Sequence, residues 1–414
     1  MNLAERLGVN RIVLALSIAR MADALGNSLM FVILPLYVAE LPAPAFTQVP
    51  ETVLVGILIS MYGLVFSGLQ PLAGALSDRA PRRKPYVMVG LLMMGVGILA
   101  YLVADRFSHL IIIRMVQGLG VAITVPAALA MMAKATHKET RGSSMGVYSA
   151  LRMTGFAIGP LLGGFVYVTY GFTSVFLIGS AFVFLSILLV QLWVHEPAGP
   201  APAPRPAGSH LIDLSVFTKD IISLGAATFL MASSFSMITT LENEFNARLQ
   251  QTALGFGLAF SALTFSRLLF QIPLGRLSDR IGRKPVIMAG LILMAPATAL
   301  LGWVGSTLQL TGLRAVQGLA AAAIAAPSFA LAGDLAREGG EGQQMSLLAM
   351  GFGLGIAIGP LMAGVLAVYS FELPFLIAAA MSLVGAWVVQ RNVPETVFRQ
   401  PRPPVEDLVG PDQV

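Results

Sequence analysis

Twelve apolar stretches, each about as long as the roughly 20 residues that a helix needs to cross a bilayer, follow one another along this chain of 414 residues. Each stretch therefore predicts one transmembrane helix. Only 11% of the residues are charged, against roughly a quarter in a typical soluble domain, and the sequence contains no cysteine. These values exclude a water-soluble enzyme, a secreted disulfide scaffold and a nucleic-acid-binding protein. The predicted spans are 12–39, 51–76, 85–104, 108–133, 142–169, 172–194, 219–246, 251–276, 285–305, 307–333, 343–370 and 372–391.

Lysine and arginine are distributed unevenly between the two faces of the predicted membrane domain. Most of the 26 basic residues lie on the face that carries the amino terminus and every second loop, whereas the opposite face has only Arg106 and Arg248. Loops rich in these residues stay on the cytoplasmic side of a membrane. We therefore expect a multi-pass protein of the inner (cytoplasmic) membrane with both termini in the cytoplasm. The net charge of +5 then reflects topology rather than an anionic partner.

The two halves of the chain repeat one another. Because each copy contains six spans in the same orientation, the repeat predicts two parallel six-helix bundles with a cavity between them near the bilayer midplane. Three pairs of segments carry the repeat: GALSDRAPRRKP at 74–85 and GRLSDRIGRKP at 275–285, RMVQGLG at 114–120 and RAVQGLA at 314–320, and GFAIGPLLGG at 155–164 and GIAIGPLMAG at 355–364.

A segment rich in proline, alanine and glycine separates the halves and is typical of a semi-extended linker. The predicted fold is therefore an all-α membrane protein of 12 transmembrane helices in two pseudo-symmetric bundles. Its predicted parts are a first bundle at 1–194, a cytoplasmic linker at 195–218, a second bundle at 219–391 and a disordered cytoplasmic tail at 392–414.

Two of the repeated loops carry a specific pattern. They follow G-x-x-x-D-R-x-G-R-R/K, the signature between helices 2 and 3 of the major facilitator superfamily. On this basis the chain is identified as a member of that superfamily and resembles its 12-helix drug:proton antiporters. The second copy is complete, whereas Pro81 replaces the second glycine of the first copy. The matching residues are Gly74, Asp78, Arg79, Arg82 and Arg83 in the first copy, and Gly275, Asp279, Arg280, Gly282, Arg283 and Lys284 in the second.

These loops are predicted to form a conformational latch. Fixed positive charges cannot enter hydrocarbon, so they hold the loops at the membrane surface. An aspartate at a helix end can accept hydrogen bonds from the opposite bundle, and these bonds must break when the cavity changes sides. An alternative for the basic residues is that they only enforce topology. The predicted latch residues are Gly74, Asp78, Arg79, Arg82, Gly275, Asp279, Arg280 and Arg283.

The fifth span resembles the antiporter signature of the family, G-x-x-x-G-P-x-x-G-G. Glycines four residues apart lie on one helix face and allow another backbone to come close, and a proline inside a helix allows bending. The resemblance to this signature, which occurs mainly among drug:proton exporters, implies efflux rather than uptake, although ordinary packing of small residues would also explain the pattern. The matching residues are Gly155, Gly159, Pro160, Gly163 and Gly164.

Ionisable residues inside the bilayer are costly and are functional candidates by default. Since the four histidines lie at span ends or in loops, a carboxylate is expected to carry the proton. Asp23 is the first choice and Glu242 the second. Arg114 begins an R-x-x-Q-G segment that resembles a family motif for proton coupling. The alternatives are that Asp23 only forms a structural ion pair with Arg20 or Arg114, and that Glu242 and Glu244 are simply solvated.

Methionine and phenylalanine residues suit a pocket that adapts to varied apolar molecules, although most of those in this chain are expected to face lipid. The predicted cavity residues are Met30, Phe31, Met237 and Glu244. The remaining arginines within the spans are expected to be structural partners or backbone anchors, and they are Arg152, Arg267 and Arg314.

The leading functional hypothesis is proton-coupled efflux of small lipophilic, drug-like compounds by alternating access. The alternatives are a proton-coupled symporter of a sugar, organic acid or other metabolite, and a lipid or lysolipid translocase. No P-loop, H-E-x-x-H segment or serine elbow occurs in the sequence, so an enzyme is not expected. The expected partners are a small-molecule substrate, protons and the lipid bilayer, without nucleic acid, metal or cofactor, and the chain is expected to be a monomer.

Overall fold

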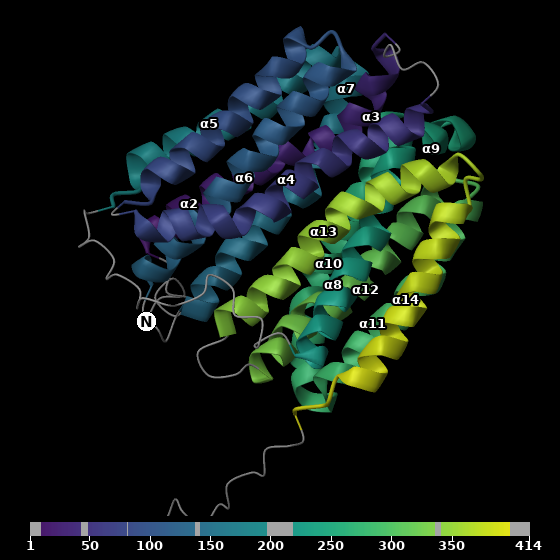
Figure 1. Ribbon diagram of the computed structural model, residues 1–414. Helices are drawn as coiled ribbons and strands as arrows, with labels where there is room; N and C mark the ends of the chain where they lie inside the picture. Colours follow the sequence, from purple (N-terminus) through teal and green to yellow (C-terminus); the bar gives the residue numbers. More distant parts are fainter. Residues whose placement is uncertain are drawn as a thin grey trace, which may run out of the picture.

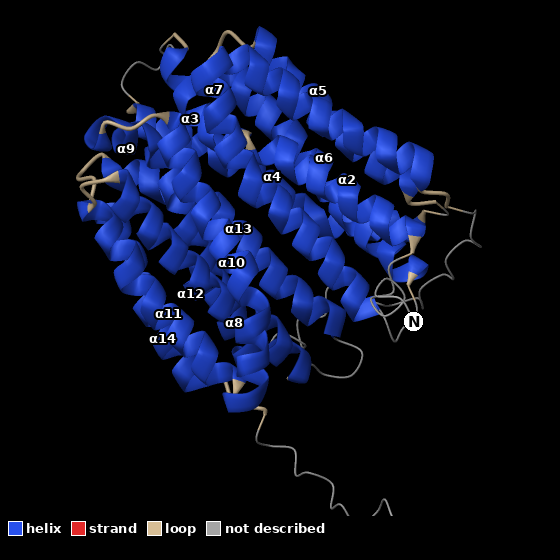
Figure 2. Ribbon diagram, turned by 180° about the vertical axis from the view of Figure 1, so that it is seen from behind, coloured by secondary structure: helices blue, strands red, loops and turns tan. Residues whose placement is uncertain are grey.

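The structure is a computed structural model that describes residues 10–42, 49–80, 82–136, 141–196, 218–335 and 341–397. Within these ranges the chain forms helices and short 3₁₀ turns and contains no β-strand. The all-α class is therefore confirmed. The helices lie in two bundles side by side, one from each half of the chain (Figure 1), and the view from behind shows the described loops gathered at the ends of the helices (Figure 2). Most of the predicted linker and of the predicted disordered tail lies outside the described residues.

The first bundle is built from the first half of the repeat. It consists of α2 (Arg11–Ser28), α3 (Met30–Glu40), α4 (Glu51–Arg79), α5 (Lys84–Ala100) with the 3₁₀ turn η1 (Tyr101–Val103), α6 (Phe107–Ala135) and α7 (Arg141–Trp193).

The second bundle repeats this order. It consists of α8 (Lys219–Ser236), η3 (Met237–Leu241), α9 (Glu242–Leu249), α10 (Ala253–Ile281), α11 (Arg283–Ala299) with η4 (Leu300–Trp303), α12 (Thr307–Asp334), α13 (Glu341–Ala367) and α14 (Leu373–Asn392).

Eleven of the described helical segments are long and apolar enough to cross a membrane, and one of them accounts for two crossings. The segment Ser143–Trp193 has 51 residues, or about 75 Å of helix, more than twice the thickness of a hydrocarbon core. Gly171 interrupts it with a left-handed φ of 76°, which glycine adopts without the steric penalty of a Cβ. The predicted boundary between the fifth and sixth spans falls at this glycine.

The first span of each bundle is broken at an equivalent place. Leu29 separates α2 from α3, and η3 separates α8 from α9. Just before each break a serine of the first span contacts the fifth span of the same bundle: the Ser28 hydroxyl donates to the Gly155 carbonyl at 3.3 Å, and the Ser236 hydroxyl donates to the Gly355 carbonyl at 3.2 Å. The internal repeat therefore includes the first and seventh spans, beyond the three pairs of similar segments.

The two bundles contact each other along a seam near one end of the molecule. At this seam the Thr52 hydroxyl donates to the Gly364 carbonyl at 3.2 Å, and the amide N–H of Leu161 donates to the Ser261 hydroxyl at 3.2 Å. The side-chain amide of Asn243 donates to the Pro35 carbonyl at 3.1 Å. Hydrogen bonds thus join α4 to α13, α7 to α10 and η3–α9 to α3 across the bundles.

The opposite end of the molecule, which carries the basic residues just before and at the start of α5 and of α11, is called the basic end here. The halves of α4 and α10 nearest this end are loosely covered. A Cβ atom added at Gly68 or Gly275 would meet no described atom within 4 Å, and Leu72 and Ile272 are 58% and 64% exposed. The seam is therefore closed away from the basic end, and the helices are less covered towards it.

Candidate functional site

The centre of the first bundle contains a buried ion pair. Asp23 and Arg20 lie one turn apart on α2, and Arg20 Nη1 contacts Asp23 Oδ2. The two residues are only 2% and 8% exposed, and Asp23 Oδ1 has no hydrogen-bond partner in the described part of the chain. The structure thus pairs Asp23 with Arg20 rather than with Arg114.

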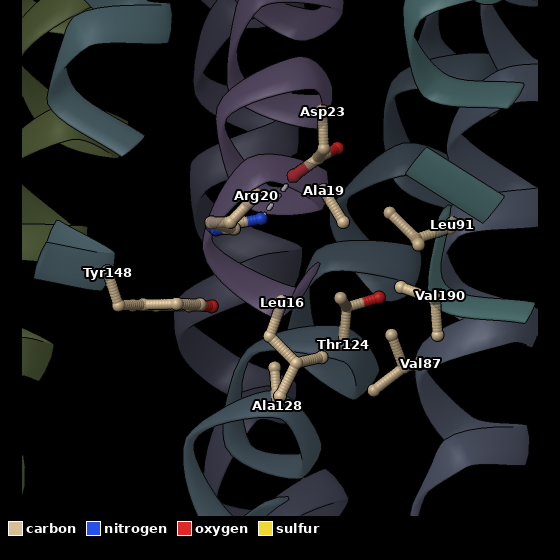
Figure 3. Close-up of a pocket in the computed structure, with 10 residues that line it drawn as sticks. All are labelled: Leu16, Ala19, Arg20, Asp23, Val87, Leu91, Thr124, Ala128, Tyr148 and Val190. Carbon is tan, nitrogen blue, oxygen red and sulfur yellow. Dashed lines mark hydrogen bonds and ion pairs between the residues drawn. The ribbon is translucent and has the colours of Figure 1, made fainter. Parts of the chain in front are cut away.

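A small cavity lies beside this pair. Figure 3 shows Asp23 and Arg20 meeting on α2, with Tyr148 pointing towards that helix and Thr124 among the lining residues. The cavity volume is about 10 Å³, which is close to the room that one water molecule requires. The hydroxyl of Tyr148 is buried and has no hydrogen-bond partner among the described residues. The surface of this cavity is nevertheless almost entirely apolar, so Asp23 lies beside a small, mostly hydrophobic space.

Arg114 belongs to a second, adjacent network. Its guanidinium group lies 5.4 Å from the Tyr62 ring centroid and donates to Gln117 Oε1 at 3.3 Å. The hydroxyl of Tyr101 donates to the same oxygen at 3.1 Å, and the amide of Asn27, one turn after Asp23 on α2, donates to the Tyr62 hydroxyl at 3.0 Å. Arg114 thus approaches the Asp23 region through Tyr62 and Asn27 and forms no ion pair with a described acid.

Arg314 occupies the corresponding place in the second bundle. It donates to the Phe235 carbonyl at 3.0 Å and to Gln317 Oε1 at 2.7 Å, and Gln317 donates to the Thr298 hydroxyl at 2.8 Å. Phe235 lies at the end of α8, where the helical ladder of hydrogen bonds ends and its carbonyl needs another donor. This contact fits the predicted role of Arg314 as a backbone anchor.

Glu242 and Glu244 lie far from Asp23 along the membrane normal. Glu242 begins α9 and is fully buried, whereas Glu244 is partly exposed. Neither carboxyl oxygen of Glu242 has a well-formed hydrogen bond within the described chain, although the Asn246 side chain lies within reach. Because Ser28 and Ser236 are equivalent, the counterpart of Asp23 in the second bundle is Met231. Glu242 follows Met231 by about three turns of helix, so it lies about 16 Å farther from the basic end than Asp23. The burial of Glu242 argues against a simply solvated side chain, and its position separates the two predicted proton carriers.

The predicted cavity residues divide into two groups. Met30 and Met237 are fully buried in the bundle cores in this state. Phe31 is partly exposed and stacks against Phe156 of α7 and Phe260 of α10, with ring centroids 6.0 Å and 5.5 Å apart. Phe31 therefore lies where the two bundles meet, which is the place predicted for the cavity.

The glycines of the antiporter signature fill two different interfaces. A Cβ atom at Gly155 or Gly159 would collide with α2 of the same bundle, and at Gly163 it would lie only 3.0 Å from the carbonyl oxygen of Leu29, between α2 and α3. At Gly164 it would lie 2.5 Å from the Ala253 carbonyl oxygen of α10, in the other bundle. Pro160 also faces α10, since its carbonyl oxygen lies against Gly257. The motif therefore packs α7 tightly within its own bundle and against the opposite one.

The predicted latch is only partly within the described structure. The side chains of Asp78 and Arg79, and Pro81, lie outside it, while Arg82 and Arg280 are exposed. In the second copy Arg283 Nη2 lies 3.5 Å from Asp279 Oδ1 and Arg283 Nη1 lies 2.5 Å from Asp334 Oδ2. These contacts stay inside the second bundle, so a latch between the bundles remains a prediction for another state. Gly74 and Gly275 lie on the loosely covered halves of α4 and α10.

One glutamate just after the last helix of each bundle accepts hydrogen bonds from the backbone of a latch loop. The sequence analysis did not identify these two residues. Glu196 accepts hydrogen bonds from the backbone N–H groups of Arg83 and Lys84, both at 2.7 Å. Glu395 accepts from those of Arg283 and Lys284 at 3.2 Å and 2.9 Å. Carboxylates are favourable at helix N-termini because unpaired N–H groups point at them. The available signal was the repeated V-x-E at 194–196 and 393–395.

The surroundings of Glu395 favour its charged form. Partial burial opposes the charge, but backbone N–H donors of Val397, Lys284, Arg283 and Thr396 outweigh burial and hold the pKa of Glu395 below its usual range. A lowered folded-state pKa means that the carboxylate stabilises the fold above the unfolded pKa of about 4.3, and that this stabilisation is lost as the pH falls through the folded value.

Glu395→Gln is therefore expected to lower the unfolding temperature slightly at neutral pH, because a neutral amide oxygen is a weaker acceptor than a carboxylate. The difference from the parent protein should shrink between pH 7 and pH 3, because the parent side chain also becomes neutral as the pH falls through the lowered folded pKa of Glu395. Thermal unfolding of purified protein in detergent at both pH values measures this. Glu40→Gln, at an exposed position, serves as the control. An equal difference at the two pH values would contradict the account.

Two parallel six-helix bundles that close around buried charges define a membrane transport protein. The family model of the Major Facilitator Superfamily matches residues 16–248 and 221–410, and the chain belongs to this family. Its substrate is therefore a small molecule, and the chain is a multi-pass membrane protein.

Named relatives and solved structures agree with this family. The chain is 27% identical over 320 residues to a multi-drug resistance efflux pump PmrA homolog of Lactococcus lactis subsp. lactis (strain IL1403), across 76% of this chain and 78% of that protein. It is 26% identical over 367 residues to the multidrug resistance protein MdtG of Escherichia coli (strain 55989 / EAEC), across 87% and 88% of the two chains. Its fold is similar to an inward-facing, occupied bacterial homolog of the human lysosomal transporter Spinster, with a TM-score of 0.72 at 15% identity, covering 92% of this chain and 96% of that chain.

Proposed function

We propose that this protein is a proton-coupled exporter of small lipophilic, drug-like compounds that works by alternating access as a monomer. The observation that carries the proposal is Asp23, a buried carboxylate on α2 inside the first bundle, with one oxygen that has no partner among the described residues. The relatives named as multidrug efflux and resistance proteins support the substrate class and the direction of transport.

Asp23 has the surroundings of a proton carrier. Burial favours the neutral carboxylic acid, whereas the nearby guanidinium groups of Arg20 and Arg152 favour the carboxylate. Small changes in the position of these arginines between two states can therefore change the proton affinity. By the equivalence of Ser28 and Ser236, the counterpart of Asp23 in the second bundle is Met231, so the proposed carrier belongs to one bundle only.

The arrangement of the bundles supports a transport cycle with alternating states. In the state described by the structure, the cavity would open towards the cytoplasm. The basic end corresponds to the face that the positive-inside rule assigns to the cytoplasm, and the seam is closed at the other end. A neutral or cationic compound that enters from the basic end and occupies the space beside Asp23 would compete with the proton. The protein would then open on the other side, where the proton replaces the compound.

Transport by purified protein in liposomes tests this proposal. With the membrane potential clamped, an acidic lumen should drive accumulation of ethidium, a lipophilic cation, because protons leave as the dye enters. Accumulation driven by an acidic exterior would instead indicate symport and would overturn the export proposal. Protein-free liposomes provide the baseline, and a sodium gradient in place of the proton gradient should have no effect.

A further inference from the structure

Two arginines at the seam are not explained by the proton site. Arg152 lies on α7 and Arg267 on α10, roughly 16 Å and 21 Å from the ends of these helices at the basic end. The two helices pack against each other across the seam, and the two guanidinium groups act on each other electrostatically. Both positive charges are thus near the middle of a hydrocarbon core about 30 Å thick, one on each of two helices that pack together from opposite bundles.

Neither arginine is in direct contact with an acid among the described residues. Within the described part of the chain, neither guanidinium group makes a hydrogen bond or an ion pair, and both Nε atoms are buried without an acceptor. Each group instead lies over an aromatic ring: Arg152 is 5.1 Å from the Phe156 centroid, and Arg267 is 5.5 Å from the Phe352 centroid. The expected role as structural partners therefore has no support, and both side chains remain partly accessible.

The acids within the described spans do not neutralise them. Asp23 is already paired with Arg20, and Glu242 lies about 16 Å farther from the basic end. Arg114 and Arg314 add two more buried guanidinium groups without an ion pair to a described acid. A charge without a partner in the membrane is costly, and that cost is offset when a ligand of opposite charge binds.

The ring beneath each arginine belongs to a larger group of aromatic side chains. The stack of Phe156, Phe31 and Phe260 continues from one bundle to the other, and Phe352 lies 6.0 Å from Phe235. Flat apolar surfaces of this kind bury the aromatic or alkyl part of a ligand, while a guanidinium fork binds carboxylate and phosphate groups through paired hydrogen bonds. Together they match an amphipathic molecule with one anionic group.

We propose that Arg152 and Arg267 form a subsite for the anionic group (a carboxylate, sulfonate or phosphate) of an amphipathic substrate. This inference rests on the proposed function in that it takes the seam to be the substrate site. The subsite takes one contact from each bundle, so an anion bound there joins the bundles in the state described. Export of such an anion from a cell with a negative interior is favoured by the membrane potential, so it does not need the proton exchange that a neutral or cationic compound needs.

The subsite also determines the sign of the proton movement on binding. The charged and titratable groups that face Asp23 are Arg20 on its own helix, Tyr62 on α4, and Tyr148 and Arg152 on α7. An anion beside Arg152 offsets the positive charge that favours the Asp23 carboxylate. Binding of an anion is therefore expected to take up a proton, whereas a cation is expected to release one.

Binding of three matched probes to the purified full chain in detergent tests the subsite without any transport. The probes are 2-naphthoate, uncharged 2-naphthamide and the cation 2-naphthyltrimethylammonium, measured by equilibrium dialysis. The parent protein should bind 2-naphthoate at least about tenfold more tightly than the amide, the size expected of a hydrogen bond to a charged group. Arg152→Gln and Arg267→Gln should each remove most of this preference and leave the affinity for the amide unchanged.

Two controls keep the outcome interpretable. Arg152→Lys retains the charge without the fork and should keep part of the preference, and Arg106→Gln, at an exposed position, should keep all of it. Equal affinity for 2-naphthoate and the amide in the parent protein, stronger binding of the cation, or no binding of 2-naphthoate would overturn the inference. The ethidium assay is independent: it can fail while 2-naphthoate binds, or succeed while 2-naphthoate does not.

Discussion

Proton-driven transport by Asp23→Asn should fall to the rate of protein-free liposomes. Asparagine has nearly the shape of aspartate and its oxygen can still accept from Arg20, but it cannot exchange a proton. Without a titratable group at this position, the substrate and the proton no longer compete, so an imposed pH gradient does no work on the substrate. Ethidium accumulation with an acidic lumen measures the effect directly.

Loss of transport alone does not distinguish coupling from misfolding, because removing one partner of a buried ion pair leaves a costly unpaired charge, about 3–5 kcal/mol. Ethidium binding in detergent should therefore persist in Asp23→Asn and should no longer release protons. The double variant Arg20→Gln/Asp23→Asn removes both charges and should fold well but remain uncoupled. Asp105→Asn, at an exposed acid that pairs with His109 at 3.0 Å, should transport normally. Coupled transport by Asp23→Asn would exclude this carboxylate as the carrier and leave Glu242 as the next candidate.

The number and order of the spans could be predicted from the sequence because hydrophobic length follows directly from bilayer thickness. The same holds for the ion pair of Asp23 and Arg20, since residues three apart on a helix lie on one face. The breaks at Leu29 and in η3 could not be predicted, because nothing in their apolar sequences marks them. They depend on the fit of α2 and α8 against the glycines of α7 and α13.

The state of the other intramembrane charges depends on how each helix is rotated, which no local pattern specifies. Arg152, Arg267 and Arg314 look alike in the sequence, yet Arg314 donates to a helix-end carbonyl and the other two face the seam without such a partner. The sequence leaves open whether Glu242 is solvated, and its complete burial follows only from the tertiary packing around η3. Residue type alone thus identified candidates, and packing determined which of them face the seam.

Gly164→Leu is expected to shift the protein out of the state in which the seam is closed, because Gly164 lies in close contact with α10. A side chain at position 164 would meet the backbone of Ala253 and Leu254 within 2.8 Å, so Gly164→Leu cannot fit while the seam is closed. When the two bundles separate at this end, the same side chain has room. Overpacking of about 1–3 kcal/mol would change the ratio of the two states by roughly 5–150-fold.

Because the chain has no cysteine, a single introduced thiol reports on the seam. Ser261→Cys places it at a position that is 7% exposed and accepts a hydrogen bond from Leu161 across the bundles. A membrane-impermeant maleimide should label it slowly in the parent background and much faster with Gly164→Leu, and transport should fall because the seam no longer closes. Gly312→Leu is the matched control, since a Cβ there would meet no described atom within 4 Å. Unchanged labelling with Gly164→Leu would mean that this contact does not separate when the cavity changes sides, and that the bundles move apart elsewhere.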